Sequence, residues 1–250
     1  MKLNIVTGSP NARKVLAVLN HLDDLDIEKN HLDFFEGDLA KPGYLAINPN
    51  GMVPSLEDGD LILWESNAIN QYICDNSSNK TLYPQNIRIR AEINRWLFWE
   101  VSHYNKALST IAFEEVAKPI FMGAEGNPEL ISNAKENLKR FATILYNHMN
   151  GREFVVGDTI TIADYALTHI EFSKDKISFD WSDYPHVNSM YERIRQNDNW
   201  TSTAPTDPSE FGRRPVSQLF LPKGRYSVNI SPANITETKG KFYFSLSFSM

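Results

Sequence analysis

The order of hydrophobic and polar positions predicts a strand, a helix and a second strand at the start of the chain. Apolar residues over 3–7 form a short strand pattern, and a Gly-Ser-Pro run at 8–10 interrupts it. Apolar residues then recur at spacings of three and four over 12–22, which predicts a helix, and 26–35 predicts another strand. A strand-helix-strand crossover makes its two strands parallel.

A hairpin and a further helix complete the first domain. The apolar runs 53–57 and 61–64 are separated by an Asp-Gly-Asp run, which has the composition of a tight turn, so these strands are expected to be antiparallel. A helix is predicted to open at Glu65 and Ser66 and to end before the polar cluster at 75–80. The domain is therefore predicted to be α/β, with one mixed sheet in the order βαβ-ββα.

From Pro84 onward the pattern becomes helical throughout. Apolar residues recur at helical spacing over 93–111, and a second helix is predicted between the Asn-Pro pair at 127–128 and Gly151. A last helix is predicted over 187–194. The second domain is therefore predicted to be all-α.

One helix start in this domain has a complete sequence signature. Thr161 is placed to cap the helix, the Asp164 carboxylate can reach back to it, and Ile160 can pack on Tyr165 as a hydrophobic staple. We interpret Asp164 as a folding residue and not as a catalytic one.

Composition and charge limit the functional classes. With 250 residues and 42% hydrophobic content, the chain is long enough for two modest cores. The net charge of −6 argues against a broad nucleic-acid surface, which needs clustered Lys and Arg. The one cysteine, Cys74, excludes an internal disulfide, and the six scattered histidines lack the spacing of a metal site, so no metal is expected. Neither a run of about 18 apolar residues nor a signal-peptide pattern occurs, which predicts a cytoplasmic protein without membrane association.

Residues 206–250 differ from the rest in charge and pattern. They hold six basic and three acidic residues, whereas the whole chain is acidic. Apolar residues alternate with other residues near the end, which is a strand pattern with no evident partner. This tail is expected to be a short β-hairpin or disordered, and no role is assigned to it.

Several motifs in the expected order resemble glutathione transferases. The segment 48–58 (NPNGMVPSLED), followed by 65–69 (ESNAI), closely resembles the glutathione-site motif of that family. The segments 95–100 (RWLFWE) and 161–167 resemble the helical domain of its bacterial members. The chain is therefore identified as a member of the glutathione transferase family.

This resemblance implies the glutathione transferase fold, a thioredoxin-like domain followed by an all-helical one. It also implies a homodimer. The predicted division is a glutathione-binding domain over 1–77, a linker over 78–86, a substrate domain over 87–205 and the tail over 206–250.

The family motif implies which residues hold glutathione. In the family, a cis Val-Pro bond turns the valine amide and carbonyl outward to pair with the tripeptide, which points to Met52, Val53 and Pro54. The alternative is an ordinary start of an edge strand. Ser66 is expected to hold the γ-glutamyl carboxylate and Glu65 the ammonium group, and capping of the helix by either residue is compatible with that.

A lysine before this motif is a further candidate. Lys41 resembles a family position that contacts the glycyl carboxylate, and the alternative is an exposed loop lysine. The chain departs from the plant phi-type pattern, because Leu39, Ala40 and Met52 stand where that class has His, Lys and Gln. Some side-chain contacts of that class are therefore expected to be missing.

The catalytic task is to stabilise the glutathione thiolate, since the ordinary pKa of such a thiol is about 8.5. Lowering it by about two units takes about 2.7 kcal/mol, within the roughly 1.5–3 kcal/mol of one hydrogen bond to a charged group. Serine-type members place a hydroxyl in the turn where Ser9 stands, so the resemblance implies Ser9 as the catalytic residue. The alternative is that Ser9 only caps the following helix.

The same turn resembles that of a second class. The Ser-Pro-Asn run at 9–11 is similar to the Thr-Pro-Asn-Gly turn of nu-class members, in which Thr and Asn accompany glutathione-dependent disulfide reduction. Asn11 is therefore the second catalytic candidate, although Ala12 stands where that class has glycine. The turn holds no tyrosine or cysteine, which argues against tyrosine-type and cysteine-type chemistry.

Aromatic residues of the helical domain are candidates for the second-substrate pocket. Trp99 and His103 share a helical face with Trp96 and are predicted to line it, while packing in the core is the alternative. The predicted function is conjugation of glutathione to small hydrophobic electrophiles in detoxification, with glutathione as co-substrate. The alternatives are a nu-class disulfide reductase and a non-catalytic protein-interaction module of the same fold.

Overall fold

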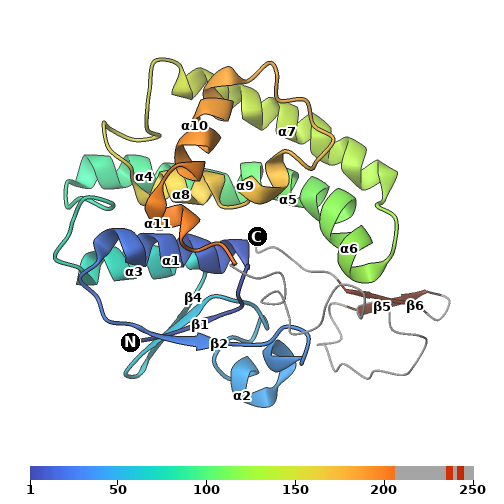
Figure 1. Cartoon of the computed structure of the whole chain (residues 1–250), viewed down its shortest axis with the longest axis horizontal. Coiled ribbons are helices and arrows are strands. Elements are labelled where there is room, and N and C mark those ends of the chain that lie inside the picture. Colours follow the sequence, from blue (N-terminus) through green and yellow to red (C-terminus); the bar gives the residue numbers. More distant parts are fainter. Residues whose placement is uncertain (206–234, 239–240, 245–250) are drawn as a thin grey trace.

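The computed structural model describes residues 1–205, 235–238 and 241–244. Figure 1 shows two layers. The lower layer is a small sheet with its own helices, and the upper layer is a larger set of helices. The lower layer contains β1 (Lys2–Ile5), α1 (Pro10–Leu22), β2 (Glu28–His31), η1 (Asp38–Ala40), α2 (Pro42–Leu45), β3 (Ser55–Asp58), β4 (Leu61–Trp64) and α3 (Ser66–Asn76).

These strands form one mixed sheet in the order β2-β1-β3-β4. β1 runs parallel to β2, with Leu3 opposite Lys29, and antiparallel to β3, with Leu3 opposite Leu56. β3 and β4 form an antiparallel pair around the turn at Gly59, whose φ of 61° suits glycine. The predicted thioredoxin-like fold with its parallel crossover is therefore confirmed.

The buried faces of α1 and α3 cover the sheet. Val15, Val18 and Leu22 of α1 and Ile69 and Ile73 of α3 are almost completely buried, at the helical spacing seen in the sequence. Figure 1 places both helices between the sheet and the helical layer. α1 and α3 therefore pack against both the sheet and the helical domain. A substitution in either helix can affect both domains.

The upper layer is all-helical, as predicted. The long helical pattern at its start forms one nearly continuous helix interrupted by two π-turns, η2 and η3. None of the described helices has the length and apolar character needed to cross a membrane. The elements are α4 (Ile87–Trp99), η2 (Glu100–Tyr104), α5 (Asn105–Ala112), η3 (Phe113–Ala117), α6 (Lys118–Met122), α7 (Pro128–Met149), α8 (Ile162–Thr168), α9 (Glu171–Lys174), α10 (Pro185–Arg195) and α11 (Asp198–Thr201).

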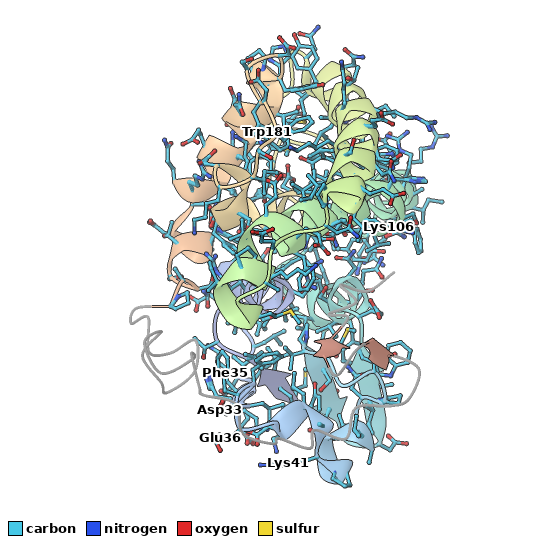
Figure 2. The ribbon with its side chains drawn as sticks, turned by 90° about the vertical axis from the view of Figure 1, so that its right-hand side faces the viewer. Asp33, Phe35, Glu36, Lys41, Lys106 and Trp181 are labelled. Carbon is cyan, nitrogen blue, oxygen red and sulfur yellow. The ribbon has the colours of Figure 1, made fainter. Side chains whose placement is uncertain are left out.

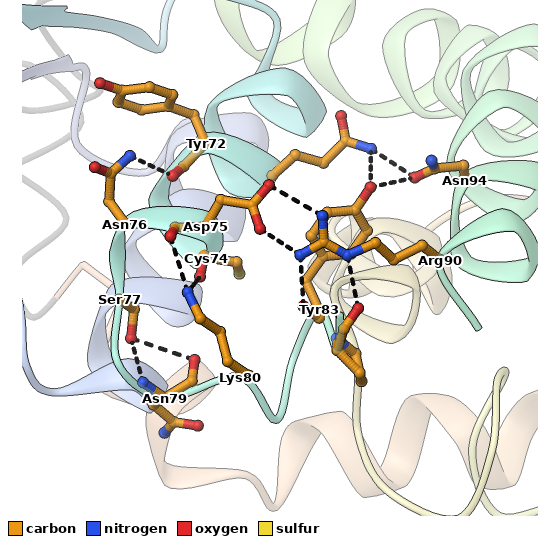
Figure 3. Close-up of polar contacts among 12 residues, drawn as sticks. Tyr72, Cys74, Asp75, Asn76, Ser77, Asn79, Lys80, Tyr83, Arg90 and Asn94 are labelled. Carbon is orange, nitrogen blue, oxygen red and sulfur yellow. Dashed lines mark hydrogen bonds and ion pairs between the residues drawn. The ribbon is translucent and has the colours of Figure 1, made fainter. Parts of the chain in front are cut away.

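A polar network ties the connection between α3 and α4 (Figure 3). The Arg90 guanidinium pairs with the Asp75 carboxylate, donates to the carbonyl of Pro84 at 2.6 Å and lies 4.2 Å from the centre of the Tyr83 ring. The Lys80 ammonium donates to the carbonyl of Asp75 at 2.8 Å. The connection is thereby fixed to both the end of α3 and the start of α4.

The predicted capping box at the start of α8 is confirmed. The Asp164 carboxylate accepts hydrogen bonds from the amides of Thr161 and Val155, both at 2.8 Å, and the Thr161 hydroxyl accepts from the Ala163 amide at 3.3 Å. Burial raises the pKa of Asp164 to about 6, against hydrogen bonds that lower it. These contacts involve only the helical domain, which fits the interpretation of Asp164 as a folding residue.

Two short strands are described in the tail. β5 (Ile235–Thr238) and β6 (Lys241–Phe244) pair in antiparallel fashion, with Ile235 opposite Phe244. The rest of the tail, over which no role was predicted, lies outside the described residues.

Candidate active site

The predicted glutathione site lies where three chain segments meet: the turn between β1 and α1, the segment that enters β3, and the N-terminus of α3. β1 and β3 are neighbours in the sheet, and α1 and α3 pack on the same side of it. Residues from far apart in the sequence therefore reach one edge of the domain.

The β1–α1 turn carries Ser9. Gly8 has a φ of 81°, which the chain needs to turn sharply out of β1, and Ser9 is the N-cap of α1. The Ser9 hydroxyl accepts from the Ala12 amide at 3.5 Å, the long limit of a hydrogen bond. A hydroxyl has one donor and two acceptor sites, so this cap leaves the O–H of Ser9 able to donate to a thiolate. The capping alternative is thus compatible with catalysis.

Two predicted site residues touch. The Ser66 hydroxyl, on the first residue of α3, donates to the side-chain oxygen of Asn11 on α1 at 3.2 Å. Ser66 is 7% exposed and Asn11 is half-buried. This contact joins the proposed catalytic turn to the proposed γ-glutamyl site.

Glu65 precedes α3 in an unusual conformation. Its φ of 72° lies in the left-handed region, which is uncommon for a residue with a side chain. Its side chain does not cap α3, although it stands at the N-cap position. A residue held in such a conformation often marks a functional site, because the surrounding structure must maintain it. Capping by Glu65, one of the alternatives from the sequence, is therefore not observed.

The segment before β3 has the expected backbone shape. The Val53-Pro54 bond is cis, as the resemblance implied. The Met52 carbonyl accepts hydrogen bonds from the Tyr44 hydroxyl at 2.5 Å and from the Asn48 amide at 2.7 Å. Within the part of the chain that the structure describes, no hydrogen bond involves the backbone of Val53. No described residue therefore occupies the backbone groups that would pair with an extended peptide.

Lys41 pairs with a carboxylate of its own segment. Figure 2 shows it at the lower edge of the N-terminal domain, on the same side as Asp33 and Glu36. Its side chain is 62% exposed and pairs with Asp38 at 2.5 Å, and this hydrogen bond raises the pKa of Lys41. Contact with the glycyl carboxylate stays a prediction, and such an anion would compete with the carboxylate that already holds this ammonium.

The two residues predicted for the second-substrate pocket contact another helix. Trp99 stacks on Tyr104 with ring centres 5.6 Å apart, and both Trp99 and His103 lie against Phe141 of α7. Trp99 is half-buried and His103 is exposed. These contacts are within the helical domain, so the pocket role of both residues stays a prediction.

Sequence reasoning missed a buried charged group behind the site. Lys14 of α1 is 1% exposed and Glu100 at the start of η2 is 0% exposed. Asn67 of α3, next to the site residue Ser66, donates to the Glu100 carboxylate at 3.2 Å. In the sequence both charged residues stand at ordinary polar helix positions, and only the packing of two domains buries them.

The site contains groups that can bind a tripeptide with a thiol. Backbone donors and acceptors at Val53, a hydroxyl at the N-terminus of α3 and a carboxylate at Glu65 match an extended peptide with an amino-acid end group. The Ser9 hydroxyl stands at the N-terminus of α1, where the helix dipole favours an anion. Among the described residues, no group of three or more His, Cys, Asp or Glu side chains is placed to hold a metal ion.

Comparisons with known proteins agree with this geometry. The family model described as the N-terminal domain of glutathione S-transferase matches residues 1–75, and the model of the C-terminal domain matches residues 115–201. The probable glutathione S-transferase GSTF2 of Oryza sativa subsp. japonica is 34% identical over 170 residues, which cover 68% of this chain and 78% of that protein.

Solved structures of the same fold include plant and fungal proteins. Glutathione transferase F7 from Populus trichocarpa matches with a TM-score of 0.73 and 26% identity, over 81% of this chain and 96% of that one. Glutathione transferase URE2P6 from Phanerochaete chrysosporium, solved in complex with oxidized glutathione, matches with a TM-score of 0.70 and 26% identity, over 81% and 93% of the two chains. With the mixed sheet, the helical domain and the matched family models, the chain belongs to the glutathione S-transferase family.

Proposed function

We propose that this protein binds glutathione at the edge formed by Ser9, Val53 and Ser66, and transfers the thiolate to small hydrophobic electrophiles. The observation that carries the proposal is the hydrogen bond of 3.2 Å between Ser66 and Asn11, which brings the γ-glutamyl site and the Ser9 turn together. The glutathione-bound relative from Phanerochaete chrysosporium supports the choice of ligand. The electrophile is specified only as a class.

Each site residue has one role in this proposal. The Val53 backbone pairs with the cysteinyl part of glutathione. The preceding residue, Met52, is fixed because its carbonyl accepts hydrogen bonds from Tyr44 and Asn48, and Pro54 follows Val53. The N-terminal amides of α3 hold the γ-glutamyl carboxylate, together with the Ser66 hydroxyl once it turns its hydrogen from Asn11 to the ligand, and Glu65 receives the ammonium group. The peptide is thus held at both its backbone and its charged end.

The chemical step is a nucleophilic substitution or addition. The Ser9 O–H donates to the sulfur, which favours the thiolate, and the thiol proton passes to solvent. The thiolate then forms a carbon–sulfur bond with the electrophile, and the leaving group departs or the addition product takes up a proton. Asn11 is the second residue of α1, its side-chain oxygen accepts from Ser66, and its amide nitrogen can donate to the sulfur.

The subtype of the active-site turn is part of the proposal. We favour the serine type, because the Ser9 hydroxyl stands at the N-terminus of the 13-residue helix α1. A nu-like turn would instead use Asn11 and would reduce one substrate disulfide to two thiols while two glutathione molecules become their disulfide. The motifs of the helical domain favour a bacterial type, whereas the relatives named above are from plants and a fungus.

We also propose a homodimer in the cytoplasm. β4 is an outer strand of the sheet and exposes apolar side chains, among them Ile62 at 44% and Trp64 at 41%. Phe98 of α4 is 69% exposed. Exposed apolar groups on an edge strand favour association, and a second copy of this chain is the occupant that the family resemblance implies. Sedimentation of the purified protein tests this state.

The experiment that tests the function measures glutathione binding and conjugation to an activated aryl chloride. Ser9→Ala is expected to lower conjugation about tenfold to a hundredfold, the equivalent of one hydrogen bond to a charged group. Thr7→Val is the matched control. It removes a hydroxyl from the same turn, and that hydroxyl contacts the His31 ring instead of a site residue.

Three results would contradict the proposal. Unchanged conjugation in Ser9→Ala would remove Ser9 from the catalytic role. Activity only towards a disulfide substrate, lost in Asn11→Ala, would assign the reductase function. No binding at millimolar glutathione would assign a non-catalytic module.

A further inference from the structure

A cavity of about 500 Å³ lies between α1, the strands β1 and β2, and the segment 202–204 that follows α11. α11 packs on α1, and Figure 1 shows the two helices next to each other. Ser9, Val53 and Ser66 of the proposed glutathione site are not among the described residues that line this cavity. Its volume is in the range of about 300–1,000 Å³ that is usual for small-molecule sites. The cavity is therefore a separate candidate for a small ligand.

Part of the cavity lining is apolar. Ile5 of β1 and Ala12 of α1 line it and are almost completely buried, and Leu16, one helical turn after Ala12, lines it and is half-buried. All three belong to the hydrophobic core or pack against it. A ligand in contact with these side chains would have its apolar surface removed from water, which favours binding.

Hydrogen bonds fix α1 to the segment after α11 at this cavity. The Asn20 amide donates to the Asn199 carbonyl at 3.2 Å and to the Ser202 hydroxyl at 3.0 Å. The Arg13 guanidinium donates to the Thr203 hydroxyl at 3.1 Å. These contacts hold the two walls in place without a ligand, so that little additional ordering is needed when a ligand binds.

The strand β2 contributes basic side chains to the cavity. Lys29 and His31 stand opposite Leu3 and Ile5 in the parallel ladder, and residues opposite each other point to the same face of a sheet. Ile5, Lys29 and His31 line the cavity together with residues of α1, so this is the face that α1 covers. β2 is an outer strand, and both of its basic side chains are exposed.

Lys29 supplies a positive charge to this cavity that has no counter-charge in the part of the chain that the structure describes. The lysines that form ion pairs there are Lys41, Lys118, Lys135 and Lys174. The Arg13 charge, in contrast, is balanced by Glu171 at 3.4 Å. None of the described residues that line the cavity is acidic, although the whole chain has a net charge of −6. A cleft with charges of one sign attracts ligands of the opposite sign.

We propose that this cavity is a second ligand site, for a small organic anion with an apolar body, such as an aromatic carboxylate. Lys29 pairs with the anionic group, and Leu16 contacts the apolar body. The His31 ring has an N–H group in either tautomer and is a second donor for the anion. The site does not rest on the proposed function, because it uses none of the residues assigned to glutathione.

The test measures binding of 2-naphthoate to the full chain by titration calorimetry, with 2-naphthamide as a neutral probe of the same shape. The wild type is expected to bind 2-naphthoate with a Kd of about 0.05–1 mM, as suits a ligand of this size. It is expected to bind 2-naphthamide about fivefold more weakly, because the amide has no charge to pair with Lys29. Millimolar S-methylglutathione is expected to change the Kd of 2-naphthoate by less than about twofold, since the two sites are separate.

Variants assign the binding to this cavity. Lys29→Gln is expected to weaken 2-naphthoate about fivefold and to leave 2-naphthamide within about twofold, because it removes only the charge. Lys139→Gln is the matched control: it removes the same charge from an exposed position of α7 outside the cavity, and both affinities should stay within about twofold. Leu16→Gln is expected to weaken both probes by about threefold or more, because apolar contact is lost, and its thermal midpoint shows whether it is folded.

Four results would overturn the assignment. The first is a wild type that does not bind 2-naphthoate at about 1 mM. The second is a wild type that binds both probes equally well. The third is a preference for the carboxylate that persists in Lys29→Gln, since the probe would then bind elsewhere. The fourth is displacement of 2-naphthoate by S-methylglutathione, which would place the probe in the glutathione site. Conjugation of glutathione tests the proposed function separately.

Discussion

Substitution of Asp164 by Ala tests the energetic role of the capping box at the start of α8. The carboxylate is 4% exposed and accepts from the amides of Val155 and Thr161, both at 2.8 Å. Each buried donor left without a partner costs about 1–3 kcal/mol, so the two together cost about 2–6 kcal/mol. Removal of a buried charge at pH 7 returns part of this, and the expected loss in the free energy of unfolding is about 2–4 kcal/mol.

Urea unfolding followed by tryptophan fluorescence measures this loss at pH 7. Ser189→Ala is a suitable control, because its hydroxyl is exposed on α10 and only donates to the Pro185 carbonyl of the same helix. The control is expected to change the free energy of unfolding by less than about 0.5 kcal/mol. A loss below about 1 kcal/mol in Asp164→Ala would refute the reasoning, since it would mean that the two amides find other partners.

The same carboxylate predicts a pH dependence of stability. Burial raises the pKa of Asp164 from 3.8 to about 6, so the folded protein holds this proton more tightly than the unfolded chain. Its contribution is fully present below about pH 4 and is lost as the pH rises through about 6, by up to about 3 kcal/mol. The stability of the wild type relative to Asp164→Asn should fall across this window, and a flat difference would contradict it.

Three further predictions concern stability and reactivity. Hydrogen bonds, first from the Ser77 hydroxyl, lower the pKa of Asp24 to about 2. The charged carboxylate therefore contributes stability above about pH 4, and this contribution is lost as the pH falls towards 2. Asp24→Asn should lack this contribution when unfolding is followed by circular dichroism. Gly126→Ala should lower stability by about 1–3 kcal/mol in thermal unfolding, because its Cβ would lie 2.6 Å from the Glu114 carbonyl oxygen; an unchanged midpoint would refute this. Burial raises the pKa of Cys74 to about 12, so a thiol reagent should label it only after denaturation.

The strands show how accurately the sequence pattern predicts the bounds of an element. β4 (Leu61–Trp64) has the predicted bounds, because an Asp-Gly-Asp turn fixes its start and the helix signal at Glu65 fixes its end. β3 starts at Ser55 and not at Val53, since Pro54 has no amide hydrogen to donate to the ladder. Elements bounded by strong turn or cap signals are therefore predictable to the residue.

Two short elements have no such turn or cap signal in the sequence that predicts them. α2 (Pro42–Leu45) spans only four residues and cannot show a helical repeat, although Pro42 stands at the first helical position. The π-turn η2 contains the buried residues Glu100 and Tyr104, and local sequence does not encode it. Both features depend on tertiary contacts that periodicity does not report.

The site was predicted from a family motif and not from physical pattern. The Val53-Pro54 bond has the cis form that the motif implied, and Ser66 and Asn11 are in contact, while their roles towards glutathione stay predictions. The burial of Lys14 and Glu100 was missed because both residues have the sequence pattern of solvent-facing positions on amphipathic helices. Burial that depends on contacts between distant segments needs coordinates.

The central claim is that the Ser9 turn makes the bound thiol of glutathione more acidic. Titration of the thiolate absorbance in the binary complex measures this pKa directly. We predict a value near 6.5 in the wild type, about two units below the ordinary value of about 8.5, and a return to within about half a unit of 8.5 in Ser9→Ala. An equally low pKa in both proteins would contradict the account.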